Sequence, residues 1–224
     1  MPDLHVLRVF CSVEREWGNQ LGVFLEGSEI AEDRRQAVAA ELGFSETVFV
    51  DDQASGELRI FTPAVELPFA GHPLVGTAWL LIRENESCPE LNPPAGKVVV
   101  RQGADGTFIA APAEWAPKFD SVQLAGPNEV RELDGPPTDA DEVYAWAWID
   151  EAAGTIRSRS FAPGFGIPED EATGSAVLGL CAQLGRPITV HQGHGSVLIA
   201  RSLEDGNVEV GGLVVLDERR EHSA

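Results

Sequence analysis

Lysine is nearly missing from this chain of 224 residues, which carries a net charge of −20 at pH 7. Only 16 basic residues oppose 36 acidic ones, and Lys97 and Lys118 are the two lysines. A surface this acidic repels nucleic-acid backbones and anionic membranes, so we expect neither as a partner. A small anionic substrate stays compatible with the charge, because dipoles inside a cleft can reverse the local field.

Cysteine is also sparse, with Cys11, Cys88 and Cys181 lying far apart in the sequence. Without CxxC pairs or an HExxH motif, these residues predict neither a disulfide framework nor a metal site. No run approaches 18 apolar residues, and the first residues lack the pattern of a secretory signal. We therefore expect a reduced protein located in the cytoplasm.

Apolar residues make up 43% of the chain, which is enough for one large domain or for two lobes of roughly 100 residues each. Ser28 is a candidate cap for a helix over residues 30–42, and a second helix is expected over 75–83. Alternation and turn signals predict strands, including a hairpin across residues 97–111. The predicted strands cover 4–10, 21–25, 45–50, 58–62, 97–102, 107–111, 143–149, 155–161, 198–201 and 208–210, with a charged tail after Leu216.

Two apolar segments, GHPLVGTAWLL and ATGSAVLGLCA, each follow a glycine-rich loop. Both are apolar almost all round, so each predicts a helix buried on every side. A helix enclosed by strands, present twice, predicts an α+β chain of two similar lobes. Chance similarity of two segments rich in glycine and alanine is the alternative.

The first turns of these two helices are candidate anion sites, because backbone N–H groups there lack partners and the helix dipole is positive. Small residues over 76–78 and 173–176 would let a ligand approach the backbone closely. If the lobes pair face to face, both helix N-termini point into one cleft. The alternative is that the small residues only permit tight packing of helix on sheet.

Three titratable residues are candidates for proton transfer. His72 lies between Gly71 and Pro73 in a rigid loop, and Asp170 lies a few residues before the second apolar helix. Glu46 lies in the apolar run FSETVFV, where burial would raise its pKa toward neutrality. Residue by residue, the alternatives stay open: a structural histidine, and a glutamate on the polar side of its strand.

Four ordered segments then make a resemblance specific: GNQLGVF, ELGFSETVFV, FAGHPLVGTA and GIPEDEATGSA. They are similar to the forms GNPxAV, ELxxSETxFV, FxGHPTxGxA and GxxEDPATGSA of the phenazine-biosynthesis, PhzF-like isomerase family. HQGHGSV at residues 191–197 resembles a shortened form of the family's QG-containing segment. The resemblance covers about residues 4–212.

The resemblance implies a diaminopimelate-epimerase-like fold, with two lobes, each a β-barrel around a central helix, and the active site in the cleft between them. We place the N-terminal lobe at 1–103 and the C-terminal lobe at 104–224, with the final strand or tail free to pack back on the first lobe. A homodimer and chemistry without a cofactor are also implied. Matching motif positions imply catalytic roles for Glu46, His72 and Asp170, and substrate-binding roles for Asn19, Ser45, Gly71, Thr77, Gly174 and Ser175.

Two departures from the family forms concern prolines, which are replaced here by Gln20 and Glu171. Both loops lose a fixed φ angle, and Glu171 adds a negative charge beside Asp170. The two thiols that racemases of this fold use are absent, because Ala70 and Ala172 occupy their places.

The leading hypothesis is a cofactor-independent isomerase that transfers a proton on a small carboxylate-bearing metabolite, with Glu46 as acid and base. The alternative is an inactive protein of the same fold that binds or senses a small anion. A purely structural interaction protein is the third possibility.

Overall fold

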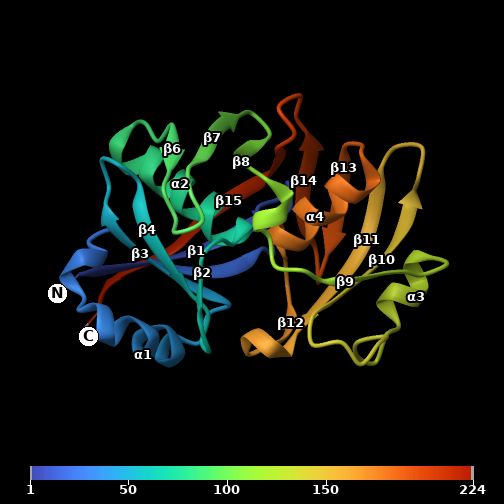
Figure 1. Ribbon diagram of the computed structural model, residues 1–224, viewed down its shortest axis with the longest axis horizontal. Coiled ribbons are helices and arrows are strands. Elements are labelled where there is room, and N and C mark those ends of the chain that lie inside the picture. Colours follow the sequence, from blue (N-terminus) through green and yellow to red (C-terminus); the bar gives the residue numbers. More distant parts are fainter. Residues whose placement is uncertain (1, 223–224) are drawn as a thin grey trace.

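The computed structural model describes residues 2–222 and confirms the predicted α+β class. Four α-helices lie against a large sheet, and the N- and C-terminal ends lie close together (Figure 1). The α-helices are α1 (Glu32–Leu42), α2 (Gly71–Asn85), α3 (Pro127–Arg131) and α4 (Gly174–Leu184). The strands are β1 (Asp3–Cys11), β2 (Asn19–Phe24), β3 (Glu46–Asp52), β4 (Glu57–Phe61), β5 (Glu66–Leu67), β6 (Glu90–Leu91), β7 (Val98–Gly103), β8 (Gly106–Ala111), β9 (Asp120–Gln123), β10 (Val143–Asp150), β11 (Thr155–Ala162), β12 (Ile167–Asp170), β13 (Ile188–Gln192), β14 (Ser196–Ser202) and β15 (Val208–Glu221).

The strands follow the order β5-β4-β3-β2-β1-β15-β14-β13-β11-β10-β9, so β15 joins the early strands to the late ones. It pairs antiparallel with β1, β14 and β8, and the predicted hairpin is confirmed as β7 and β8. The charged segment after Leu216, expected as a tail, is part of β15, which continues to Glu221 and pairs with Asp3 of β1. The boundary between residues 103 and 104 stays a prediction.

Two helix starts differ from the sequence predictions. Ser28 lies in a 3₁₀ turn, and α1 begins at Glu32 after Ala31, so Ser28 does not cap it. The second helix begins at Gly71 rather than near residue 75. Pro73 then lies in the first helical turn, where the missing N–H of proline has no intrahelical partner to lose.

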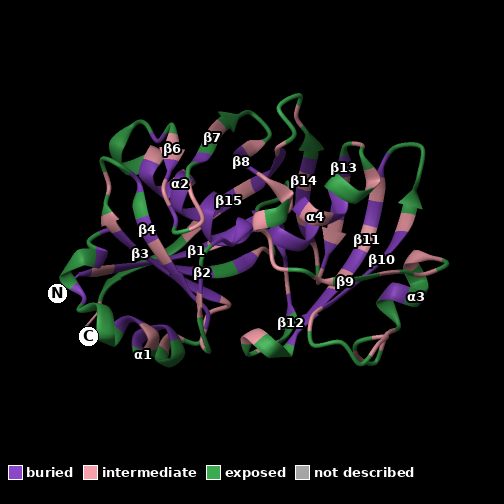
Figure 2. Ribbon diagram, in the orientation of Figure 1, coloured by how far each residue is buried: buried purple, intermediate pink, exposed green. Residues whose placement is uncertain are grey.

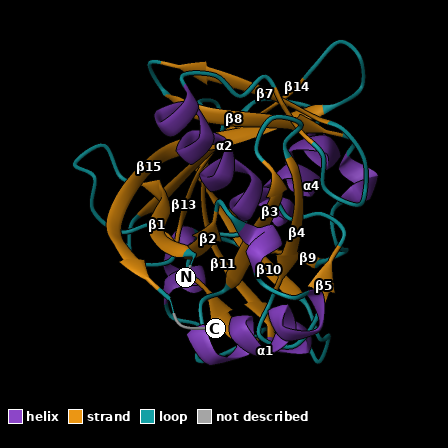
Figure 3. Ribbon diagram, turned by 90° about the vertical axis from the view of Figure 1, so that its left-hand side faces the viewer, coloured by secondary structure: helices purple, strands orange, loops and turns teal. Residues whose placement is uncertain are grey.

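Both apolar helices are buried, as expected from their composition (Figure 2). Helix α2 packs on β1, β2, β3, β8 and β15, and α4 packs on β14 and β15; Figure 3 shows α2 beside several of these strands. Gly76 brings α2 close to the sheet, since a Cβ there would lie 2.5 Å from Leu21 and 2.8 Å from Val9. Tight packing therefore explains the small residues around Gly76.

The three cysteines are unpaired and buried. Within residues 2–222, the longest apolar helix is still too short to cross a bilayer.

The N-terminal turns of α2 and α4 meet backbone to backbone. A Cβ on Gly174 would lie 2.9 Å from the backbone nitrogen of His72 and 3.1 Å from the carbonyl carbon of Gly71. A Cβ on Gly71 would lie 2.9 Å from the carbonyl carbon of Gly174. Only glycine fits at either position, because real Cβ atoms do not approach a backbone this closely.

The glycine contact predicts opposite effects of two alanine substitutions in the same helix. Gly174→Ala forces the two helix ends apart and should lower the free energy of unfolding by roughly 1–3 kcal/mol. Gly179→Ala is the control: it meets nothing within 4 Å and should raise that free energy by about 0.5–1 kcal/mol. Urea denaturation followed by circular dichroism measures both, and equal effects would contradict the close contact.

Candidate active site

A buried carboxylate and a buried imidazole come together where β3 and α2 begin. Glu46 is the first residue of β3, and His72 is the second residue of α2. Glu46 Oε2 lies 2.8 Å from His72 Nδ1, and the side chains are only 10% and 2% exposed. Glu46 therefore points into the protein and not to solvent, which was the alternative left open by the sequence.

The other ring nitrogen of His72 identifies the tautomer that costs least. His72 Nε2 is buried and has no hydrogen-bond partner among residues 2–222. A proton on Nε2 of a neutral ring would leave a buried N–H unsatisfied there, which costs more than leaving a lone pair unpaired. Of the two neutral tautomers, we therefore assign the one that carries its proton on Nδ1 and donates it to the Glu46 carboxylate.

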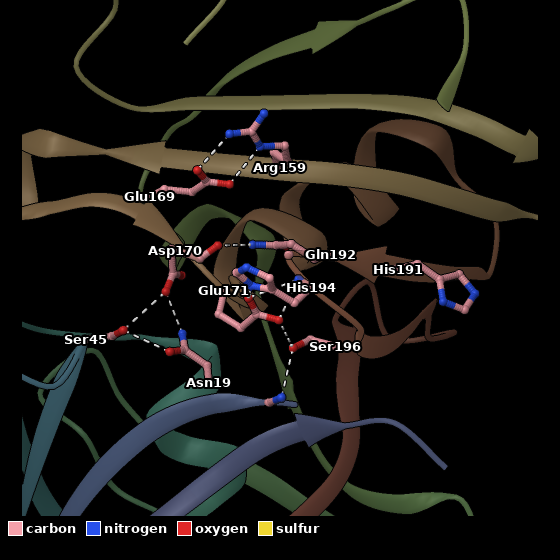
Figure 4. A network of polar contacts seen from close by, with 12 residues as sticks. Asn19, Ser45, Arg159, Glu169, Asp170, Glu171, His191, Gln192, His194 and Ser196 are labelled. Atoms are coloured by element: carbon pink, nitrogen blue, oxygen red, sulfur yellow. Dashed lines mark hydrogen bonds and ion pairs between the residues drawn. The ribbon is translucent and has the colours of Figure 1, made fainter. Parts of the chain in front are cut away.

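Asp170 is the last residue of β12 and is buried under a set of donors. Its Oδ1 accepts a hydrogen bond from Asn19 Nδ2 at 2.6 Å and lies 3.3 Å from Ser45 Oγ. Its Oδ2 accepts a hydrogen bond from Thr173 Oγ1 at 2.6 Å. Ser45 Oγ also donates to Asn19 Oδ1 at 2.9 Å. Asn19 at the start of β2 and Ser45 just before β3 therefore jointly fix the position of the Asp170 carboxyl (Figure 4).

Burial raises the pKa of Asp170 from 3.8 to about 6, and the negative charge of Glu46 adds to the rise. His72 and the donors Thr173 and Asn19 act in the opposite direction on this pKa. The three predicted catalytic side chains therefore influence one another electrostatically. Because the folded protein holds a proton on Asp170 that the unfolded chain releases near pH 4, the stability contributed by Asp170 falls as pH rises through 6.

Two residues that the sequence did not single out support this arrangement. Gln192 Nε2 donates to the backbone oxygen of Asp170 at 3.0 Å and to Thr173 Oγ1 at 2.9 Å. Tyr144 donates its hydroxyl to Ser158 Oγ at 2.8 Å and lies 3.1 Å from Gln192 Oε1. The QG pair at residues 192–193 was the available signal for Gln192. Tyr144 gave no signal beyond an apolar strand.

A small cavity of about 30 Å³ is lined by both acidic side chains. Glu46, Asp170, Thr173 and Ser175 line it together with the apolar residues Leu67, Ala70, Pro117, Phe119, Ala162, Phe165 and Ile167. A space of this size holds about one or two waters. A second cavity of about 320 Å³ shares Pro117, Phe119 and Ser175 with it and extends to Lys118 and Tyr144.

The residues predicted to bind substrate fall into three positions. Asn19 and Ser45 contact Asp170, and Ser175 lines both cavities. Gly71 and Gly174 form the helix contact, and the N–H of Gly71 already donates to Ser175 Oγ at 3.0 Å.

Thr77 is a correction, because it lies in the second turn of α2 and is completely buried. The helix begins six residues earlier, so Thr77 does not line the cavity and cannot present a free N–H there.

Comparisons with known proteins show which family this chain is similar to. Residues 8–129 match the family model described as phenazine biosynthesis-like protein. The trans-2,3-dihydro-3-hydroxyanthranilate isomerase of Pseudomonas aeruginosa is 32% identical over 75% of this chain and 75% of its own length. The isomerase of the same name from Pseudomonas fluorescens is 29% identical, with 86% of each chain covered. A solved PhzF-family protein of Enterococcus faecalis superposes with a TM-score of 0.79 at 21% identity, covering 100% of this chain and 99% of its own.

An α+β fold with a buried acid pair and isomerase relatives defines this chain as an isomerase. It belongs to the phenazine biosynthesis-like, or PhzC-PhzF, protein family.

The electrostatic coupling predicts an unusual titration of Asp170. In ¹³C NMR of the side-chain carboxyls, Asp170 should titrate near pH 6. Glu46→Gln should lower this midpoint, because it removes the negative charge that helps to raise it, while burial keeps the midpoint above 3.8. Glu41→Gln, an exposed change at the end of α1, is the control and should leave it unchanged. A midpoint near 4 in the unmodified protein would contradict the buried placement of Asp170.

Proposed function

We propose that this isomerase moves a proton on a small carboxylate-bearing metabolite, with Glu46 as the acid and base and without a cofactor. The observation that carries the proposal is the buried Glu46–His72 pair, 2.8 Å apart, in which Glu46 lines a cavity together with Asp170. A base that is shielded from bulk water meets few competing solvent molecules, and its charge is felt strongly.

The proposed reaction balances within the substrate. The Glu46 carboxylate takes a proton from a carbon next to a conjugated system, and the electron pair of that C–H bond moves into the π system. Protonated Glu46 then returns the proton to another carbon, so the π bonds shift and nothing is oxidised or reduced. His72, through its Nδ1 proton, orients Glu46 Oε2 and stabilises its negative charge before and after the transfer.

Asp170 suits a supporting role in the same site. Its pKa of about 6 allows it to hold a proton or a negative charge near neutrality. We propose that it stabilises or relays charge on the substrate while Glu46 performs the transfer. The partners Asn19, Ser45 and Thr173 fix its two oxygens in position.

We propose that the substrate carboxylate lies at the N-terminus of α4, near Ser175. Ser175 lines both cavities, and the helix dipole favours a negative group there. A ring-sized acid exceeds the cavity of about 30 Å³ but fits a space of about 320 Å³. Binding next to Glu46 therefore requires that the two spaces join, which movement of Pro117 and Phe119, lining both of them, would allow.

The named relatives suggest trans-2,3-dihydro-3-hydroxyanthranilate as the first compound to test. An anionic substrate, a homodimer and a cytoplasmic location stay predictions for this chain. So does the arrangement of two barrels around central helices.

Glu46→Gln should reduce turnover roughly 10²–10⁴-fold, because the amide cannot accept or return the proton. The assay follows isomerisation of that compound and deuterium incorporation in D₂O by NMR. Glu41→Gln removes an equal charge outside the site and should keep the activity of the unmodified protein.

Retained turnover in Glu46→Gln would overturn the role of Glu46. Binding of the compound by the unmodified protein without deuterium incorporation would favour the alternative, an inactive anion-binding protein.

A further inference from the structure

Glu171 follows Asp170 directly, and its carboxylate is enclosed by the turn between β13 and β14 (Figure 4). It accepts hydrogen bonds from the backbone N–H of His194 at 2.9 Å, from His194 Nδ1 at 2.7 Å and from Ser196 Oγ at 2.8 Å. Gly193 makes room for this carboxylate, because any Cβ at its φ of +56° would collide with the Glu171 oxygens. The turn is thus shaped around one acidic side chain.

Ser196 extends these contacts to β2. Its Oγ accepts a hydrogen bond from the backbone N–H of Gly18 at 3.1 Å. The next residue, Asn19, donates its side-chain amide to Asp170 Oδ1 at 2.6 Å. Two connections therefore run side by side between the same two segments: Asn19 to Asp170, and Gly18 through Ser196 to Glu171.

The exposed side of this arrangement is covered by an aromatic contact. The rings of Trp17 and His194 stack with centroids 5.5 Å apart and an angle of 16° between their planes. Gly195 permits this, because a Cβ there would overlap the indole ring of Trp17. The contact keeps the turn against the segment that leads into β2.

We propose that Glu171 is a positioning residue that fixes the Asp170 carboxyl by anchoring the β12–α4 loop to the β13–β14 turn and, through Ser196, to Gly18. The contribution of Glu171 to catalysis rests on the proposed function. The related motif has proline at this position. In this chain, the hydrogen bonds of Glu171 to His194 and Ser196 restrain the loop in place of the fixed φ of proline. The turn residues 194–196 therefore supply the hydrogen-bond donors that hold Glu171, and Glu171 supplies the acceptor that holds the turn.

The test compares Glu171→Ala, Glu171→Gln and Ser196→Ala by amide hydrogen exchange. Glu171→Ala should speed exchange at Gly18 roughly tenfold, because Ser196 loses the acceptor that orients it toward Gly18. Glu171→Gln keeps one acceptor oxygen at nearly the same place and should give a smaller increase. The double variant Glu171→Ala/Ser196→Ala should exchange at Gly18 little faster than either single variant, since both substitutions break the same connection from Gly18 through Ser196 to Glu171.

Glu169→Gln is the matched control, because it breaks the Glu169–Arg159 ion pair two residues away without touching the hydrogen bonds of Glu171. It should leave Gly18 exchange unchanged, with the core amide of Leu198 as the reference for global unfolding. Carboxyl ¹³C spectra of the same variants report whether the Asp170 titration moves in Glu171→Ala, a readout that a loss of stability alone does not change. If Glu171→Ala and Glu169→Gln give equal Gly18 exchange and equal Asp170 titration, the positioning role is wrong.

Turnover separates this inference from the proposed function. With an active protein, Glu171→Ala should lower kcat roughly ten- to hundredfold with a smaller change in KM, since a misplaced group slows the chemical step. An unchanged kcat would overturn the positioning role. If the unmodified protein converts no substrate but Gly18 exchange and Asp170 titration still respond to Glu171, the proposed function fails and the anchoring of Asp170 stands.

Discussion

The close backbone contact between the N-terminal turns of α2 and α4 is the constraint on which the rest of the site depends. Gly71 and Gly174 have no side chains to hold the helix ends apart, so Ala70, just before α2, and Ser175, in the first turn of α4, line the same small cavity. The N–H of Gly71 is satisfied by Ser175 Oγ, which ties the two helices at the same point. Residues separated by about a hundred positions in sequence thereby share one cavity.

Around this contact the protein accumulates buried polar groups that oppose folding. Two carboxyl groups and an imidazole lie together with little access to water, and burial raises the pKa of Asp170 to about 6. Isolated charges in such a place are costly, which is why hydrogen-bond donors surround Asp170. These groups are held by a continuous sheet in which β15 joins the early strands to the late ones. Such a division between a stable scaffold and a costly site is expected of an enzyme.

Glu171, one of the substitutions that distinguish this chain from the related motifs, is matched by its neighbours in space. Glu171 lies against the turn formed by His194 and Ser196, so a changed loop is matched by a changed turn. The hydrogen bonds continue from Ser196 to Gly18, which is the neighbour of Asn19. The loss of a proline is therefore accompanied by new hydrogen bonds at the same place.

The sequence predicted the hairpin β7–β8, most strands and both buried helices, because alternation, turn residues and apolar composition are local signals. It also named Glu46, His72 and Asp170, whose surrounding motifs are distinctive. It failed where the outcome depended on distant partners. Helix α2 begins at Gly71 and accommodates Pro73 in its first turn, so Thr77 lies in the second turn and is buried in the core. The charged end of β15 is a strand because β1 pairs with it.

What the sequence determined by itself was the class of fold, the family and the residues able to carry a proton, since these follow from composition and local order. Tertiary structure alone decided which of those residues meet. The 2.8 Å contact of Glu46 with His72 and the enclosure of Asp170 by Asn19, Thr173 and Gln192 arise from packing of separate segments. Burial and through-space charge set the reactivity of such groups, and neither is a property of any short stretch of chain.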